Sequence, residues 1–240
     1  TRAIGYVKQF FPDCEPTYHH VDFPIAPGLD IEVHYRPTWL YNPIINKRLQ
    51  RYFETVAQEQ FGNGTTTANG SFPSPTPAFN RIYILLHIYR HLFFQGIGMR
   101  QMLDYYFVLQ QGFTEEERTE TMRTLRSLRM QRFTEAVMWV LQEVFAMDER
   151  YLLTKPNEEE GRFLLSEIMM AGNFGQQRLL GIFQTADHLF DRCAFRHIQL
   201  HKLLEHRVRE GLIPFRNLQH RVMLPDASNF RGDNTGGDGV

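Results

Sequence analysis

The stretch LDIEVHYR, residues 29–36, decides the fold class predicted for the first part of the chain. Apolar and polar side chains alternate along it in the order Ile31, Glu32, Val33, His34, Tyr35, Arg36. A period of two is typical of a β-strand with one apolar and one polar face. The polar face carries a carboxylate, an imidazole and a guanidinium. It is therefore either a solvated face, in which Glu32 pairs with Arg36 or with a neighbouring strand, or one wall of an active site.

Two other β-rich runs precede this stretch, GYVKQFF at residues 5–11 and HHVDFPI at residues 19–25. Turn-forming residues separate the three runs, Pro12-Asp13 and Ala26-Pro27-Gly28. Because the Pro-Gly connection is very short, we expect the last two runs to pair as an antiparallel hairpin. His19-His20 opens the second run, where it either places an imidazole near Glu32 or simply ends the strand.

The chain becomes helical in character from Pro43 onward. Apolar residues recur at helical spacing in residues 44–61, and Pro43 suits the start of a helix. Residues 62–78 are rich in Gly, Asn, Thr, Ser and Pro, which predicts an exposed loop. The remaining pattern predicts helices at residues 79–95, 99–111, 115–127, 131–145, 158–171, 177–190 and 193–210, with Thr114 as an N-cap.

These patterns predict an α+β fold, in which a small N-terminal antiparallel β unit is followed by a mostly α-helical domain. We expect the N-terminal α+β unit to span residues 1–61 and the helical domain residues 79–224, with the loop at 62–78 between them. The tail, residues 225–240, lacks apolar periodicity and is predicted to be disordered.

Composition places the chain among ordinary soluble globular proteins. Of its 240 residues 42% are hydrophobic and 22% are charged, and the formal net charge is −1. This balance gives no reason to expect a nucleic-acid partner or an anionic membrane surface. No apolar run approaches the roughly 20 residues that span a bilayer. Cys14 and Cys193 lie far apart and form no metal-binding spacing, so we expect a reducing cytoplasm.

A histidine pair lies in the strongly apolar segment 84–109. His87 and His91 are four residues apart and therefore share one face of a helix. A zinc-protease helix has a Glu directly after the first His, and Ile88 stands there instead. A metalloprotease is therefore disfavoured.

Arg100 and Asp104 have the same spacing on the next predicted helix. If the two helices turn back on each other at Gly96 and Gly98, His91 lies close to this pair. The three residues then form either a buried polar network between apolar helices or a cluster that contacts a phosphate group of a substrate.

Two stretches together resemble a known family. They are IEVHYRP, residues 31–37, followed by a helix, and LLHIYRHLFFQGIGMRQMLDYYFVL, residues 85–109. They are similar to the uncharacterised nucleotidyltransferase-like family that is common in bacterial genomes. Its members carry a strand of the form apolar–acid–apolar–His–aromatic, then a His-x-x-x-His-like helix and an Arg-x-x-x-Asp-like helix. The resemblance covers about residues 3–110 and includes the earlier GY, HHVDF and Gly pattern.

The resemblance implies a fold of the polymerase-β nucleotidyltransferase type, with the β unit as a partial nucleotidyltransferase sheet. In that superfamily an Asp-x-Asp pair follows a Gly-Gly or Gly-Ser turn, and a third metal-binding acid comes from a later strand. Glu32 matches the third acid, which implies a catalytic role in Mg²⁺-dependent phosphoryl chemistry. The resemblance also implies substrate or phosphate contacts for His34, His87, His91, Arg100 and Asp104.

The Gly-Ser turn and the Asp-x-Asp strand are expected upstream of residues 5–11 and do not occur in the 240 residues. We therefore expect a truncated chain or one that has lost catalysis. Nucleotidyl transfer from a nucleoside triphosphate to a small-molecule or protein hydroxyl would then be incomplete in it. Two other hypotheses stay open: a non-catalytic helical module that binds a protein partner through residues 84–109 and 196–210, and a helical metal-binding protein that uses His87 and His91.

Overall fold

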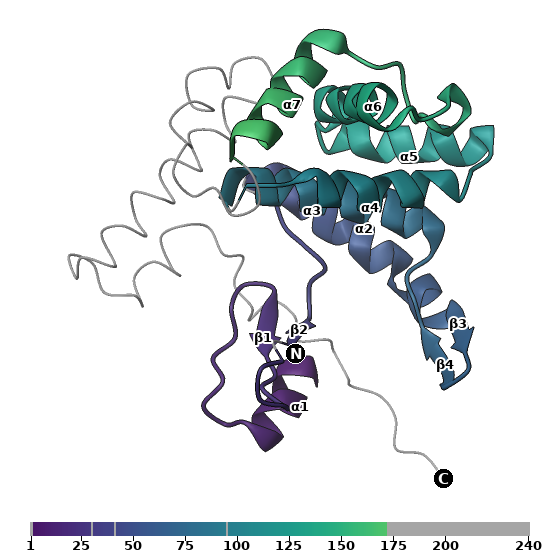
Figure 1. The fold of residues 1–240 in the computed structure, drawn as a ribbon. Coiled ribbons are helices and arrows are strands. Elements are labelled where there is room, and N and C mark those ends of the chain that lie inside the picture. The colour runs from purple at the N-terminus through teal and green to yellow at the C-terminus, as the bar shows by residue number, and fades with distance from the viewer. Residues whose placement is uncertain (1, 30, 41, 95, 172–240) are drawn as a thin grey trace. The chain divides into compact units, whose positions relative to one another are not determined.

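A computed structural model describes residues 2–29, 31–40, 42–94 and 96–171 of the chain. In these residues a helix and a short hairpin come first, and a second hairpin and further helices follow (Figure 1). The elements are α1 (Arg2–Phe10), β1 (His20–Asp22), β2 (Glu32–His34), α2 (Pro43–Gly62), β3 (Gly64–Thr67), β4 (Gly70–Pro73), α3 (Pro77–Phe94), α4 (Met99–Gln110), α5 (Glu115–Ser127), α6 (Gln131–Phe145), the 3₁₀ turn η1 (Glu149–Tyr151) and α7 (Glu158–Ala171). The predicted α+β class is confirmed.

Strands β1 and β2 form the antiparallel hairpin that the Ala26-Pro27-Gly28 turn predicts. Residues 20, 21 and 22 of β1 stand opposite residues 34, 33 and 32 of β2. Each strand has only three residues, fewer than the predicted runs. Val21 is fully buried, whereas Asp22 and Glu32 are exposed. The hairpin therefore has the one apolar and one polar face that the alternation predicts.

The prediction of a strand at residues 5–11 is wrong, because these residues lie in α1 and the turn that follows it. Their apolar residues fit helical spacing as well: Val7 is fully buried, and the Tyr6 and Phe10 rings meet at 5.3 Å on one face. The Phe11 ring packs edge-on against Phe23, with centroids 5.5 Å apart. Packing against Phe23 thus overrides the β propensity of the aromatic residues.

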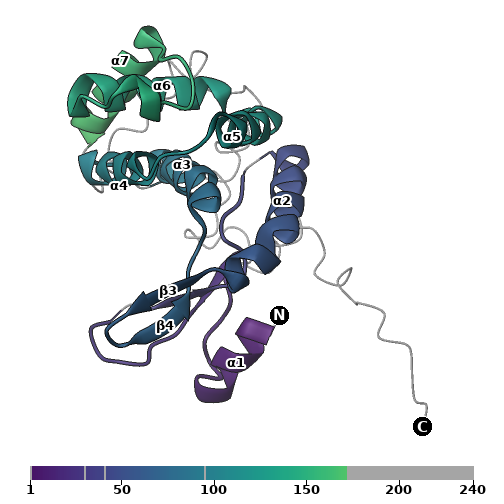
Figure 2. The ribbon, with the colours of Figure 1, turned by 90° about the vertical axis from the view of Figure 1, so that its right-hand side faces the viewer.

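The segment 62–78 is not a plain loop. It contains the hairpin β3–β4, which connects α2 to α3 (Figure 2). Both strands are exposed throughout, as predicted, and the Thr66 and Ser71 hydroxyls bond across them at 2.9 Å. Gly70 has a φ of 127°, a conformation that suits glycine beside a tight turn. The division of the chain into domains at this segment stays a prediction.

Apolar packing between helices forms the core of the described residues. Helices α3 and α4 lie side by side (Figure 1), and α6 packs against α5 and α7. Helix α6 is buried without a break from Ala136 to Leu141. The Phe133 ring meets Tyr89 of α3 edge-on, at 5.1 Å between centroids. This contact joins the α3 layer to α6.

A charged side chain of α3 is enclosed in this core. Arg81 of α3 is 1% exposed, donates to the Gly112 carbonyl at 3.3 Å and pairs with the Glu117 carboxylate at 3.0 Å. Glu117 in turn accepts from the backbone N–H of Thr114, whose hydroxyl accepts from the N–H of Glu117. This capping box confirms Thr114 as the N-cap of α5. Arg81 therefore ties α3 to the start of α5.

The helices predicted from residue 79 to residue 171 are confirmed to within two residues at each end. The helices expected at 177–190 and 193–210 and the disordered tail lie outside the described residues. No helix in the described part of the chain has the length and apolar character needed to cross a membrane.

Candidate functional site

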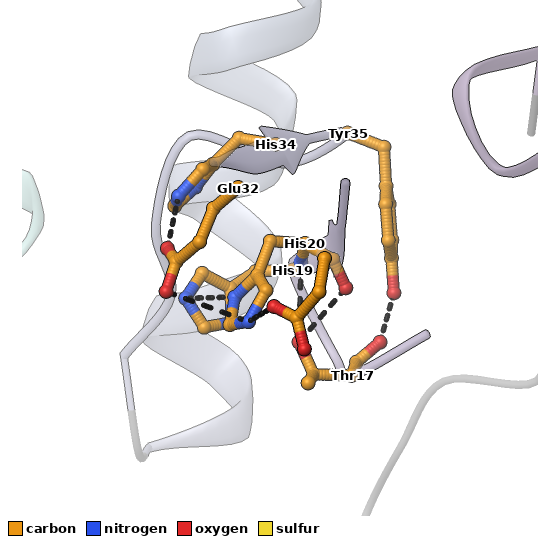
Figure 3. Close-up of polar contacts among 7 residues, drawn as sticks. Thr17, His19, His20, Glu32, His34 and Tyr35 are labelled. Carbon is orange, nitrogen blue, oxygen red and sulfur yellow. Dashed lines mark hydrogen bonds and ion pairs between the residues drawn. The ribbon is translucent and has the colours of Figure 1, made fainter. Parts of the chain in front are cut away.

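The polar face of the β1–β2 hairpin gathers four titratable side chains (Figure 3). The backbone N–H of Tyr35 donates to the His19 carbonyl at 3.0 Å, and that of Phe23 donates to the Ile31 carbonyl at 2.8 Å. Hydrogen-bonded and non-hydrogen-bonded pairs alternate along antiparallel strands. The pairs 20/34 and 22/32 are therefore non-hydrogen-bonded pairs, in which side chains come closest.

Glu32 is the centre of this group. Its Oε2 lies 2.9 Å from Nε2 of His34, and its Oε1 lies 3.7 Å from Nε2 of His20. The same His20 nitrogen is 3.5 Å from Oδ1 of Asp22. Glu32 thus pairs with its own strand and with the neighbouring strand. The alternative partner, Arg36, instead lies over the Tyr18 ring at 4.5 Å and donates to the Tyr18 carbonyl.

Asp22 and Glu32 stand directly opposite each other on the exposed edge of this group. Two like charges in such a pair destabilise a hairpin. His20 lies within 4 Å of both carboxylates. A positive charge at this point would offset their repulsion.

His19 extends the group toward the interior. Its side chain is buried, and Nδ1 of His20 lies 3.2 Å from its Nε2. Burial lowers the pKa of His19 to about 3, and the charge of Arg90 acts in the same direction. His19 is therefore a neutral imidazole near neutral pH.

One face of α3 provides a second set of rings. Phe79, Tyr83, His87 and His91 recur every four residues, and successive centroids are 5.5, 5.8 and 4.1 Å apart. Both histidines are half-buried. The predicted position of His87 and His91 on one helix face is confirmed.

Electrostatic interactions connect this face of α3 to the hairpin. Burial lowers the pKa of His87 to about 4, with further lowering by His91, Arg90 and His34, while Glu32 acts in the opposite direction. Burial also raises the pKa of Tyr83, and the Glu32 charge adds to that shift. The structure therefore brings Glu32, His34 and His87, all predicted site residues, into one electrostatic environment.

Arg90 supplies positive charge to the same environment. Its guanidinium lies over the Trp39 ring at 5.6 Å from the centroid, and its charge acts on His19, Tyr83 and His87. A guanidinium held over an aromatic ring is a pre-organised partner for phosphate.

Arg100 and Asp104 lie elsewhere. Both are exposed on α4, and within the described residues no ion pair joins them. The interpretation of this pair as part of a buried network between helices is therefore wrong. Their contribution to a substrate site stays a prediction, as do the roles of Glu32, His34, His87 and His91.

Sequence reasoning missed Asp22, the buried position of His19 and the role of Arg90 as a neighbour of the histidines. Asp22 could have been found from the alternation of side chains, because in the predicted hairpin Asp22 and His20 share a face with Glu32 and His34. The burial of His19 and the position of Arg90 depend on contact between the hairpin region and α3, which the sequence pattern does not reveal.

A known protein family matches the part of the chain that contains these residues. The model of the family described as "uncharacterised nucleotidyltransferase" matches residues 2–146, a span that contains the hairpin, α3 and α4. Among curated proteins and among solved structures, none matches the chain. Since the matched span is more than half of the 240 residues, the chain belongs to the uncharacterised nucleotidyltransferase family.

Proposed function

We propose that the β1–β2 hairpin is part of a metal-dependent nucleotidyltransferase site, in which Glu32 is a metal-binding acid. The observation that supports this most directly is the cross-strand pair of Glu32 and Asp22, both exposed and both near His20. The family match supplies the reaction class, transfer of a nucleotidyl group from a nucleoside triphosphate.

The two carboxylates fit Mg²⁺. This ion prefers oxygen ligands and commonly takes only one or two carboxylates from the protein, with phosphate and water oxygens completing its shell. When bound, Mg²⁺ would neutralise charge on the triphosphate. Among the described residues no third carboxylate lies with Asp22 and Glu32, so the carboxylates of this face support one Mg²⁺ ion and not a pair of Mg²⁺ ions.

The remaining residues have roles that follow from their charge. His34 is oriented by its bond to Glu32. His87 is neutral near pH 7 because its pKa lies near 4, so it can donate a hydrogen bond to an acceptor hydroxyl or a phosphate, or accept one from the hydroxyl. Arg90 is permanently charged and suits a phosphate oxygen. The acceptor is a small-molecule or protein hydroxyl, and the reducing cytoplasm remains the predicted location.

Ligand-dependent melting tests this function in the chain itself. A nucleoside triphosphate with Mg²⁺ should raise the melting temperature, because a ligand that binds only the folded state stabilises it. Asp22→Asn and Glu32→Gln should each reduce the shift. Glu15→Gln removes a similar exposed carboxylate, one paired with Lys8, and should leave the shift unchanged. No shift at millimolar nucleotide in the unaltered chain contradicts nucleotide binding here.

Activity is the second test. Glu32→Gln should abolish nucleotidyl transfer while the melting temperature without ligand stays near its normal value. Retained transfer would refute the role of Glu32, whatever the melting experiment shows.

A second candidate function, a helical module that binds a protein partner, is favoured by one observation. Leu103 and Phe107 of α4 are 37% and 57% exposed and share a face with Arg100 and Asp104. An exposed apolar pair between charges is typical of interaction surfaces. Leu103→Ser with Phe107→Ser should then abolish partner binding without changing the nucleotide-dependent shift in melting temperature.

A further inference from the structure

Three imidazoles gather at the inner end of the same hairpin. One ring nitrogen from each of His19, His20 and His34 lies within 4.8 Å of the other two. The closest pair is Nε2 of His19 and Nδ1 of His20, at 3.2 Å. The ring centroid of His34 lies 5.1 Å from the ring centroid of His19 and 5.4 Å from that of His20. Figure 3 shows these rings beside Glu32.

These distances fit a tetrahedral metal ion. With metal–nitrogen bonds of about 2.0–2.1 Å, two ligand nitrogens of a tetrahedral zinc site lie about 3.3 Å apart. The His19–His20 nitrogens already have that separation. The third nitrogen reaches it by an inward movement of about 1.5 Å or less, a shift within the range of side-chain rotation.

The backbone supports all three ligands. His20 and His34 face each other as a cross-strand pair, in the non-hydrogen-bonded position that brings side chains closest. The carbonyl of His19 accepts the backbone N–H groups of Tyr35 and Arg36 at 3.0 and 3.2 Å. His20 and His34 are therefore held by the two strands, while His19 directly precedes β1 and is tied through its carbonyl to the residues that follow β2.

The surroundings match those of a zinc ligand set. His19 is buried beside the other two rings, and metal ions bind the neutral form of imidazole. The carboxylate of Glu32 lies 2.9 Å from Nε2 of His34, which leaves Nδ1 of His34 as the nitrogen for the metal ion. A carboxylate bonded to the other ring nitrogen of a ligating histidine is the usual orienting partner in zinc sites. Imidazole ligands select Zn²⁺ and its transition-metal neighbours, whereas carboxylates alone suit Mg²⁺.

We propose that His19, His20 and His34 form a binding site for a transition-metal ion of the Zn²⁺ class, with three protein ligands and one open coordination position. This site is distinct from the carboxylate pair Asp22 and Glu32, although both sets include His20. It does not depend on nucleotidyl transfer, because its ligands and its selectivity follow from the imidazoles alone.

Titration with Zn²⁺ of the metal-free full chain tests the site, by calorimetry and by competition with a chromophoric chelator. The unaltered chain should bind Zn²⁺ with micromolar or better affinity. The double variant His20→Gln/His34→Gln should lose one equivalent of bound Zn²⁺, or bind it about tenfold or more weakly. His91→Gln, which removes a half-buried imidazole on α3, distinguishes this site from a metal site at His87 and His91, and should bind Zn²⁺ as the unaltered chain does.

Three results would overturn the proposal: no Zn²⁺ binding by the unaltered chain, undiminished binding by the double variant, or a loss with His91→Gln equal to that of the double variant. Co²⁺ gives a readout that does not depend on the folding of a variant. The unaltered chain loaded with Co²⁺ should show the intense visible bands of a four-coordinate ion, and their absence contradicts the site. None of these measurements contains nucleotide, so failure here leaves the melting test of nucleotide binding intact.

Discussion

His87 should make the folded chain sensitive to mild acid, and replacing it by Gln should remove that sensitivity. In the folded state the pKa of His87 is about 4, because the half-buried ring lies among His91, Arg90 and His34. In the unfolded chain it returns to about 6.5. The unfolded state therefore binds the proton at higher pH. Stability is fully present above about pH 6.5 and is lost as the pH falls toward about 4.

The size of the loss follows from the two pKa values. Between about pH 7.5 and about pH 5 the linkage relation gives about 2 kcal/mol for a shift of this size. Because the ring is only half-buried, screening by solvent reduces this to about 1–2 kcal/mol. For a domain of this size that is a shift in melting temperature of about 2–8 °C.

Urea unfolding at the two pH values measures this loss in the unaltered chain and in His87→Gln. The difference between the losses of the two proteins isolates His87, since the other titrating groups are common to both. The comparison at about pH 7.5, where the imidazole is neutral in both states, reports only the effect of the substitution on packing. Equal losses in the two proteins would refute the assignment of a lowered pKa to His87.

Two further predictions concern the helical core. Glu117→Gln keeps the capping geometry but leaves the Arg81 guanidinium, which is 1% exposed, without its anionic partner. The free energy of unfolding, measured by urea titration, should fall by about 2–3 kcal/mol. A loss no larger than that of an exposed ion pair would contradict the importance of burial. Gly161→Ala would place a Cβ 2.5 Å from Cε3 of Trp139 and should lower the free energy of unfolding by about 1–3 kcal/mol. Gly5→Ala in α1 meets no atom within 4 Å and should raise the free energy of unfolding by about 0.5–1 kcal/mol. If the two variants change the melting temperature in the same direction, the close approach of α7 to α6 is contradicted.

The sequence predicts most of the helices because their signals are local. The capping box formed by Thr114 and Glu117 predicts the start of α5. The apolar spacing in α3 and α6 predicts these helices without information about the elements that pack against them. The β1–β2 hairpin is equally local, because a short turn joins two alternating runs. The alternation also predicts that Glu32 and His34 share the polar face, whereas their roles in a site come from the family resemblance and stay predictions.

The errors occur where a neighbour in space decides the conformation. Residues 5–11 have aromatic and β-branched side chains that favour a strand, but packing on Phe23 selects a helix. In residues 62–78 the chain turns at Ala68-Asn69, directly before Gly70, and general loop composition concealed this hairpin signal. The neutral state of His19 and His87 depends on burial and on Arg90, which no spacing rule provides.

The three-residue strands of β1 and β2 have a consequence for the dynamics of the hairpin. Isolated pairs of so few residues are marginally stable, so this hairpin should open locally at a lower free energy than the core around α6. A ligand that bridges the two strands adds its own binding free energy to their pairing. The backbone N–H groups of Tyr35 and Phe23 bond across the hairpin, so their hydrogen exchange should slow as the fraction of chains with bound ligand increases. The exchange rate of these two amides therefore measures ligand binding to the polar face.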